Sequence, residues 1–200
     1  YAKWVKDVTV QIFNESEELD ELTVENGSSI DLSQYAPVKT GYTLSGWTDG
    51  ENDYPAAAKV TVYEDTVFTA MWIRNNYTVE VMDGEEKLGS WQIAYGENFT
   101  FDAPAKTGFD FVALYTDETL TQKAELPYAI TANTVLYAKY EKQTFTVTLV
   151  YGEGDRQSKT VEYGETFNPP AAEKEGYVFG GWYKDEALTQ RAESFEVTQD

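Results

Sequence analysis

The sequence predicts a mainly β chain built as a tandem array of three modules of about 68 residues, with a small α+β module as the alternative. The same anchor motifs recur three times at a period of 67 to 69 residues, and fixed-period self-similarity indicates an array of like units. Each copy also opens with strict alternation of apolar and polar residues, which is typical of a half-buried strand in an antiparallel sheet.

The opening strand of each repeat is defined by its apolar positions, which are Val8, Val10 and Ile12, then Tyr77, Val79 and Val81, then Phe145, Val147 and Leu149. A polar turn follows, and a second run, predicted to be a strand, ends at Asn26-Gly27, Tyr95-Gly96 or Tyr163-Gly164. Two such runs around a short polar turn predict a β-hairpin at the start of every repeat.

A Lys-x-Gly turn comes next, at Lys39 to Gly41, Lys106 to Gly108 and Lys174 to Gly176. Glycine at such a turn indicates a backbone position with positive φ. A third strand leaves the turn, as in Tyr177 to Trp182. The motif Asp-Glu-x-Leu-Thr-Gln at 117–122 and 185–190 predicts a turn or one short helical turn, and a strand such as Thr134 to Tyr140 closes the repeat.

These anchors divide the chain into repeats at 5–72, 73–140 and 141–200. Tyr1-Ala2-Lys3-Trp4 resembles the end of a closing strand, so residues 1–4 are predicted to be the tail of a preceding repeat. Residues 198–200 align with 131–133, after which the second repeat has its closing strand, so the third repeat is predicted to lack that strand. Connections of three or four residues, about 73–76 and 141–143, predict a semi-rigid string of modules.

The charge balance excludes several classes of partner. The chain has 35 Asp and Glu against 15 Lys and Arg, a net charge of −20. Nucleic acid is excluded as a partner because phosphate binding needs Lys and Arg patches. No run approaches the roughly 18 apolar residues of a membrane span, so we expect no membrane insertion by this chain. A solvated, self-repelling surface predicts a monomer in solution.

The side-chain inventory argues against catalysis. The chain has no histidine and no cysteine, which removes Ser-His-Asp and Cys-His sites and the usual zinc ligand sets. Paired carboxylates need a cleft that separates their pKa values, and the acidic residues here are spread over all repeats. We therefore predict no catalytic residues, no cofactor and no enzyme activity.

Two site candidates remain. Asp49, Glu51 and Asp53 form an oxygen-rich loop found only in the first repeat. The loop lacks the twelve-residue EF-hand pattern, so a polar turn is the favoured interpretation and a metal site the alternative.

The other candidate is aromatic. Trp47, Trp72 and Trp182 stand at repeat anchors and are predicted to be core residues. The counterparts of Trp91 are Lys159 and, roughly, Leu22. Trp91 is therefore the best candidate for an exposed, ligand-stacking ring, although packing is the favoured interpretation.

The anchors together resemble a known family. The order of anchor motifs is clearest in the third repeat, which has Tyr163-Gly164, Pro169-Pro170, Gly176-Tyr177 and Gly181-Trp182-Tyr183. This order of motifs resembles the Listeria–Bacteroides repeat, also called the internalin B-type B repeat. The first repeat departs at Asn26-Gly27, and the second has Ala113-Leu114 in place of Gly-Trp. The resemblance covers almost the whole chain and implies β-grasp-like modules in a bacterial cell-surface or secreted, hence extracellular, protein, with no catalytic residues to carry over.

The function expected from these observations is a non-catalytic repeat region that acts as a semi-rigid stalk or spacer and as a protein-interaction module. Its partners would be a host protein, a neighbouring surface protein or a glycan. The alternative is an adhesin that binds host protein or glycan directly through the repeats. An adhesin predicts a contiguous aromatic patch or a bare sheet edge, whereas a stalk predicts neither.

The absence of Cys and His and the dispersed carboxylates predict that folding needs no metal. We expect the melting temperature to be the same with and without a chelator such as EDTA. A large loss of melting temperature with chelator would contradict this prediction and would point first at residues 49–53.

Overall fold

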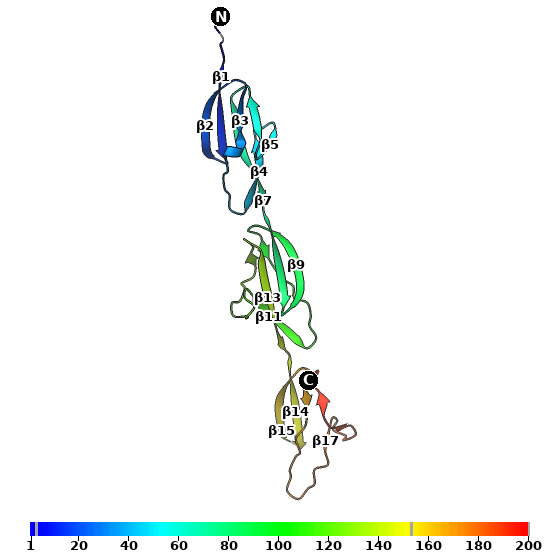
Figure 1. Cartoon of the computed structure of the whole chain (residues 1–200). Coiled ribbons are helices and arrows are strands. Elements are labelled where there is room, and N and C mark those ends of the chain that lie inside the picture. Colours follow the sequence, from blue (N-terminus) through cyan, green and yellow to red (C-terminus); the bar gives the residue numbers. More distant parts are fainter. Residues whose placement is uncertain (3, 153, 200) are drawn as a thin grey trace. The chain divides into compact units, whose positions relative to one another are not determined.

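The computed structural model describes residues 1–2, 4–152 and 154–199 (Figure 1). Nearly all of its regular structure is β-strand. Within the described residues the only helix is the short 3-10 helix η1 (Leu32–Gln34), so the predicted mainly β class is confirmed. The six-residue motifs at 117–122 and 185–190 form turns without a helix. The β-grasp-like identity of the modules stays a prediction.

The first repeat holds a five-stranded sheet in the order β2-β1-β7-β4-β5. Its strands are β1 (Asp7–Asn14), β2 (Glu17–Glu25), β4 (Tyr42–Thr48), β5 (Asp53–Pro55) and β7 (Thr66–Arg74). The predicted hairpin β1–β2 is antiparallel, whereas β1 runs parallel to the closing strand β7. A second antiparallel pair, β3 (Ser28–Asp31) with β6 (Lys59–Val62), completes the repeat.

The core of this repeat lies between the sheet and the β3–β6 pair. The apolar positions that alternate along β1 are buried there, together with side chains from the other strands: Val8, Val10, Ile12, Ile30, Leu32, Trp47, Val62, Phe68 and Ala70. Trp47 is completely buried, with an exposed fraction of 0%. Period-two burial along β1 is what the sequence pattern predicts for a strand with one buried face.

Gly46 in β4 sits at a β-bulge between Leu44 and Gly46. A Cβ at Gly46 would lie 2.1 Å from the Tyr54 carbonyl oxygen. Since real Cβ atoms do not approach an oxygen this closely, the close backbone approach of β5 requires glycine here.

The second repeat has a four-stranded sheet in the order β11-β13-β8-β9 and a small pair, β10 with β12. Its strands are β8 (Asn76–Asp83), β9 (Glu86–Ala94), β10 (Asn98–Phe99), β11 (Phe109–Tyr115), β12 (Tyr128–Ala129) and β13 (Thr134–Lys142). Leu114, the counterpart of Trp47, is buried in the same way as Trp47.

The third repeat is described as three two-stranded sheets, β14-β15, β16-β19 and β17-β18. Their strands are β14 (Thr144–Gly152), β15 (Asp155–Glu162), β16 (Thr166–Phe167), β17 (Trp182–Tyr183), β18 (Arg191–Ala192) and β19 (Phe195–Glu196). The predicted third strand, 177–182, is wrong for residues 177–181. In the first two repeats the matching strands β4 and β11 pair with β7 and β13, and no described strand pairs with 177–181.

By its contacts the chain divides into two compact units. The first contains Tyr1–Val79, Ser90–Thr100 and Leu126–Thr134, and the second contains Glu80–Gly89, Phe101–Glu125 and Val135–Asp200. The boundary runs through the second repeat, so these units do not coincide with the predicted modules. The module boundaries 5–72, 73–140 and 141–200 stay a prediction, as does the tail at 1–4. Lys3 of that tail lies outside the described residues, as do Glu153 and Asp200.

The connections between repeats are shorter than the sequence predicts. Strand β7 ends at Arg74 and β8 begins at Asn76, while β13 ends at Lys142 and β14 begins at Thr144. A single residue, Asn75 or Gln143, therefore separates consecutive repeats. The closing strands run two residues further than their apolar pattern indicates, because their last residues still pair with the strand that follows the Lys-x-Gly turn.

Candidate functional site

The junction between consecutive repeats is the feature with the most regular set of contacts, because the same backbone hydrogen bonds occur at both junctions. We call joint 1 the set Gly41, Asn75 and Tyr95, and joint 2 the set Gly108, Gln143 and Tyr163. In joint 1 the Asn75 N–H donates to the Gly41 carbonyl at 2.9 Å, and the Asn75 carbonyl accepts from the Tyr95 N–H at 2.8 Å. The single linking residue is thus bonded through its backbone to the repeat before it and to the repeat after it.

The side chain of Tyr95 lies directly on Gly41. A Cβ on Gly41 would fall 2.0 Å from Cδ1 of the Tyr95 ring, and Gly41 also has a φ of +77°. Both the space and the backbone conformation therefore require glycine. The ring of Tyr95 makes edge contacts with Tyr42 before the joint, at 6.4 Å between centroids, and with Tyr77 after it, at 6.3 Å. Such edge-to-face pairs are favourable beyond the area they bury.

Joint 2 repeats this geometry. The Gln143 N–H donates to the Gly108 carbonyl at 2.8 Å, and the Tyr163 N–H donates to the Gln143 carbonyl at 2.8 Å. A Cβ on Gly108, whose φ is +76°, would lie 2.0 Å from Cδ1 of Tyr163. The same geometry thus occurs at both junctions: the Lys-x-Gly turn of one repeat packs against the Tyr-Gly pair of the next.

Polar side chains add contacts that differ between the joints. In joint 1 the Thr43 hydroxyl donates to Oδ1 of Asn75 at 2.7 Å. Arg74 donates from Nε to the Tyr95 carbonyl and from Nη1 to Oε1 of Glu97, both at 2.8 Å. In joint 2, Nε2 of Gln143 donates to Oδ1 of Asp110 at 2.8 Å. The Arg74–Glu97 ion pair is exposed and contributes under about 1 kcal/mol, so the seated tyrosine ring and the backbone bonds dominate.

The turn of the third repeat has the same local form. Gly176 has a φ of +79°, and among the described residues no atom lies within 4 Å of a Cβ placed on it. At the other end, Asn26 stands where later repeats have tyrosine, and its N–H donates to the Lys6 carbonyl at 2.9 Å. Sequence reasoning identified both motifs but placed the Tyr-Gly pair at the end of the second strand and the Lys-x-Gly motif in a later turn. Their recurrence at matched spacing in consecutive copies was the available signal that they meet.

The lysine of each turn packs on the aromatic residue three positions later. Nζ lies 4.4 Å from the ring centroid of Tyr42 for Lys39, 5.0 Å from that of Phe109 for Lys106, and 4.7 Å from that of Tyr177 for Lys174. Two of these lysines also pair with a carboxylate, Lys39 with Glu15 and Lys106 with Asp83. Cation–π packing of this kind holds the turn against the strand that follows it.

The predicted metal candidates Asp49, Glu51 and Asp53 form a capped turn. Oδ1 of Asp49 accepts from the backbone N–H of Glu51 at 2.9 Å and of Asn52 at 2.7 Å, and Oδ2 accepts from the Tyr54 hydroxyl at 2.6 Å. These bonds, that from Tyr54 above all, lower the pKa of Asp49 to about 2. Within residues 1–2, 4–152 and 154–199, no three carboxylates are placed to share a metal ion.

Asp117 and Asp185 cap the six-residue turns of the other two repeats. Asp117 accepts from the hydroxyl of Thr119 and from the N–H groups of Thr121 and Gln122. The hydroxyl bond from Thr119 is the largest cause of a pKa well below the ordinary value. The pKa of Asp185 is lowered in the same way, first by the hydroxyl of Thr189. In each of the loops at 49–53, 117–122 and 185–190, an aspartate carboxylate thus accepts hydrogen bonds from backbone N–H groups of its own turn.

The predicted ligand-binding candidate Trp91 lies on β9 with an exposed fraction of 37%. Its ring packs on the buried Phe99, with 5.2 Å between centroids. In the third repeat Lys159 covers the matching Phe167, with Nζ 5.5 Å from the ring centroid. Trp91 therefore covers the core while presenting about a third of its surface. Of the tryptophans predicted to be core, Trp47 is buried and Trp72 and Trp182 are half-buried.

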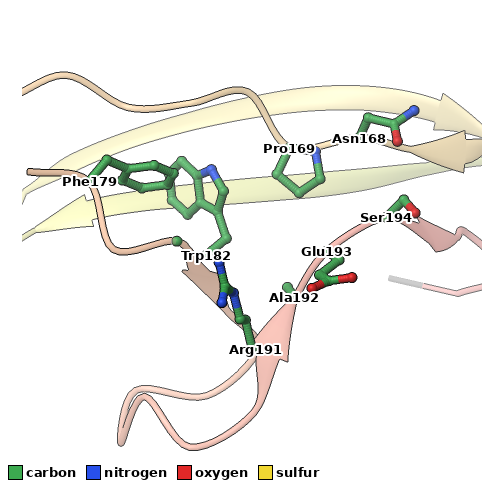
Figure 2. A pocket seen from close by; sticks show the side chains of 9 residues that line it. Asn168, Pro169, Phe179, Trp182, Arg191, Ala192, Glu193 and Ser194 are labelled. Carbon is green, nitrogen blue, oxygen red and sulfur yellow. The ribbon is translucent and has the colours of Figure 1, made fainter.

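A hollow of about 230 Å³ lies in the third repeat (Figure 2). Phe179 and Trp182 line one side of it with their rings in edge contact at 5.6 Å, and Arg191 and Glu193 line another. Nε1 of Trp182 donates to the Pro170 carbonyl at 2.6 Å. In the first repeat the counterpart Trp47 is paired with Ala70 of β7 and buried. In the third repeat Trp182 is half-buried instead, and the lining of the hollow alone does not identify a ligand.

No helix in the described part of the chain is long and apolar enough to cross a membrane. The Listeria-Bacteroides repeat domain matches the sequence at residues 9–71, 77–139 and 145–199. This finding confirms the three tandem copies that the anchors predict.

Two longer proteins from Evansella cellulosilytica are similar to this chain. One, named "Putative membrane protein", is 32% identical over 202 residues, which cover 95% of this chain and 30% of that protein. The other, named "Putative Gly-rich membrane protein", is 34% identical over 167 residues, covering 78% and 19%. The chain thus spans less than a third of the length of these curated relatives.

The seating of Tyr95 predicts an unequal response to two glycine substitutions. Both Gly41→Ala and Gly50→Ala place a side chain at positive φ, which costs about 1–3 kcal/mol. No atom of the residues that the structure describes lies within 4 Å of a Cβ placed on Gly50, so Gly50→Ala is the matched control. We expect Gly41→Ala to lower the free energy of unfolding by more than Gly50→Ala and to shift the NMR signals of the Tyr95 ring. Equal losses with unchanged Tyr95 signals would contradict the joint.

The capped turn of Asp49 predicts a pH dependence. Because the pKa of Asp49 is lowered to about 2 in the folded chain from an ordinary 3.8, its stabilising contribution is complete above about pH 4. It is lost as the pH falls toward 2. Tyr54→Phe removes the largest cause, so we expect the Asp49 titration midpoint, followed by carboxyl-carbon NMR, to move up. A midpoint unchanged by Tyr54→Phe would refute this assignment.

Proposed function

Because the chain belongs to the Listeria-Bacteroides repeat domain family, we propose that it is a non-catalytic repeat region of a bacterial cell-surface or secreted protein. It acts as a semi-rigid stalk or spacer and presents its β modules for protein interaction. The observation that carries this proposal is the joint, which occurs twice with the same geometry. A chain selected only to connect modules would not need a tyrosine fitted onto a glycine at each junction.

The joints support stiffness for a simple mechanical reason. One linking residue has two soft backbone torsions, and both of its backbone groups are bonded at 2.8–2.9 Å to the repeats on either side in joint 1. Rotation about Asn75 would break those bonds and lift the Tyr95 ring from Gly41. The same holds for Gln143 in joint 2. Flexible linkers, by contrast, are long and rich in Gly and Ser.

The proposed location and the lack of catalysis rest on separate observations. Two longer relatives carry names that place them among membrane proteins, which supports a cell-surface or secreted, extracellular setting. The chain has no Cys and no His, and the aspartates of its loops are engaged in capping their own turns. These features favour a binding or structural role without cofactor over an enzyme.

The second candidate function is an adhesin that binds host protein or glycan directly through the repeats. The partly exposed ring of Trp91 on β9 favours it, because aromatic side chains are enriched among the residues that anchor binding partners. A glycan array and a host-protein binding screen with the chain would test it, using Trp91→Ala as the variant and Trp91→Phe as the matched control. Binding that Trp91→Ala abolishes would favour the adhesin over the spacer.

The spacer predicts an extended chain in solution. We expect small-angle X-ray scattering to give a radius of gyration clearly above the roughly 16 Å of a compact 200-residue globule. Tyr95→Ala combined with Tyr163→Ala should broaden the distribution of end-to-end distances, because both seated rings are lost. Tyr63→Ala, which removes an exposed tyrosine outside the joints, is the control. A radius near 16 Å would refute the spacer.

A further inference from the structure

We propose that the parallel strand pair β1–β7 is a shear clamp that lets the repeat carry tension along the chain. This inference rests on the proposed stalk and adds a mechanical task to it. A stalk that only spaces needs stiff joints. A stalk that holds a load also needs modules that do not unravel when pulled from their two ends.

The direction of the strands sets how a pull acts on them. Residues 10–13 of β1 pair in parallel with residues 66–69 of β7, from Val10 opposite Thr66 to Phe13 opposite Thr69. The chain enters at the start of β1 and leaves at the end of β7 (Figure 1). In a parallel pair these two points lie at opposite ends. A pull along the chain therefore slides the strands past each other and loads all of their hydrogen bonds at once.

Side-chain bonds extend the pair beyond the backbone ladder at both ends. The Thr9 N–H donates to Oδ1 of Asp65 at 2.8 Å, one residue before β7 begins. Past the other end of the ladder, Nε1 of Trp72 donates to Oδ1 of Asn14 at 3.2 Å. Sliding by one residue would break both bonds together with the ladder between them.

Burial resists the same movement. Val10 and Ile12 of β1 and Phe68 of β7 have exposed fractions of 0%. A one-residue slip in a strand turns the buried side chains to the opposite face, so the slide cannot begin without exposing these side chains. The hydrogen bonds and the core thus oppose the pull at the same step.

The hairpin β1–β2 would respond differently. Its strands are antiparallel, with Asp7 opposite Glu25 at the open end. A pull applied across that end loads the outermost hydrogen bond alone and opens the pair one bond at a time. The fold therefore offers a strong and a weak direction within one repeat, and the chain runs along the strong one.

The second repeat receives the load through joint 1. Strand β7 passes through Asn75 directly into β8. There the Thr78 N–H donates to Oδ1 of Asn133 at 2.9 Å, which matches the bond of Thr9 with Asp65 in the first repeat. In both repeats a polar side chain just before the closing strand holds the opening strand.

Pulling one folded chain in two directions tests the clamp. The chain has no cysteine, so introduced cysteines give unique handles for single-molecule force spectroscopy. Val5→Cys with Ile73→Cys pulls the first repeat along the chain, and Val5→Cys with Glu25→Cys pulls across the open end of the hairpin. All three positions are exposed. The unfolding force reflects the unfolding rate under load. Since the first geometry loads all hydrogen bonds of the β1–β7 pair at once, we expect it to need at least about twice the unfolding force of the second geometry at the same loading rate.

A variant arm uses the first geometry alone. Asp65→Ala removes the acceptor of the Thr9 N–H and should lower the unfolding force, whereas the neighbouring exposed Glu64→Ala should leave it unchanged. Equal forces in the two pulling directions, or equal effects of the two alanine variants, would overturn the clamp. Either result would leave the proposed spacer function intact, because that function is tested by scattering on the whole chain. Conversely, a compact chain in scattering would refute the spacer function without changing the ratio of the two unfolding forces.

Discussion

The parallel pairing of β1 with β7 is the constraint on which the rest of the repeat depends. It places the first and the closing strand side by side in the middle of the sheet, with β2 on one flank and β4 on the other. It buries Val10, Ile12 and Phe68 in one core. Because parallel strands enter and leave at opposite ends, the pairing also lets one repeat follow another through a single residue.

The joints turn that short connection into a defined contact. A lone residue between two strands would still rotate if nothing held it, but the carbonyl of Gly41 and the N–H of Tyr95 bond it on both sides. The glycine is needed twice over, for its positive φ and for the aromatic ring that occupies the place of a side chain. Stiffness between repeats and the fold within each repeat therefore draw on the same turn.

Some of the acidic residues of the chain stabilise its turns, in addition to solvating its surface. Asp49, Asp117 and Asp185 each accept hydrogen bonds from the backbone of their own turn. A carboxylate used in this way is held charged, which its lowered pKa reflects. These aspartates satisfy backbone N–H groups of their own short turns, and their bonding favours capping over metal binding as their role.

The sequence by itself determined the β class, the three copies, the hairpin at the start of each repeat and the positive φ of Gly41, Gly108 and Gly176, because period-two alternation and turn glycines are local signals. It also pointed to Trp47 as core. Only the tertiary structure decided that β1 pairs in parallel with β7, that residues 177–181 are not a strand, and that Tyr95 sits on Gly41 across a one-residue link. Those outcomes depend on which distant segments meet, and local sequence patterns do not specify this. For Tyr95 and Gly41 the recurrence of both motifs at matched spacing hinted at the contact, but only the structure showed it.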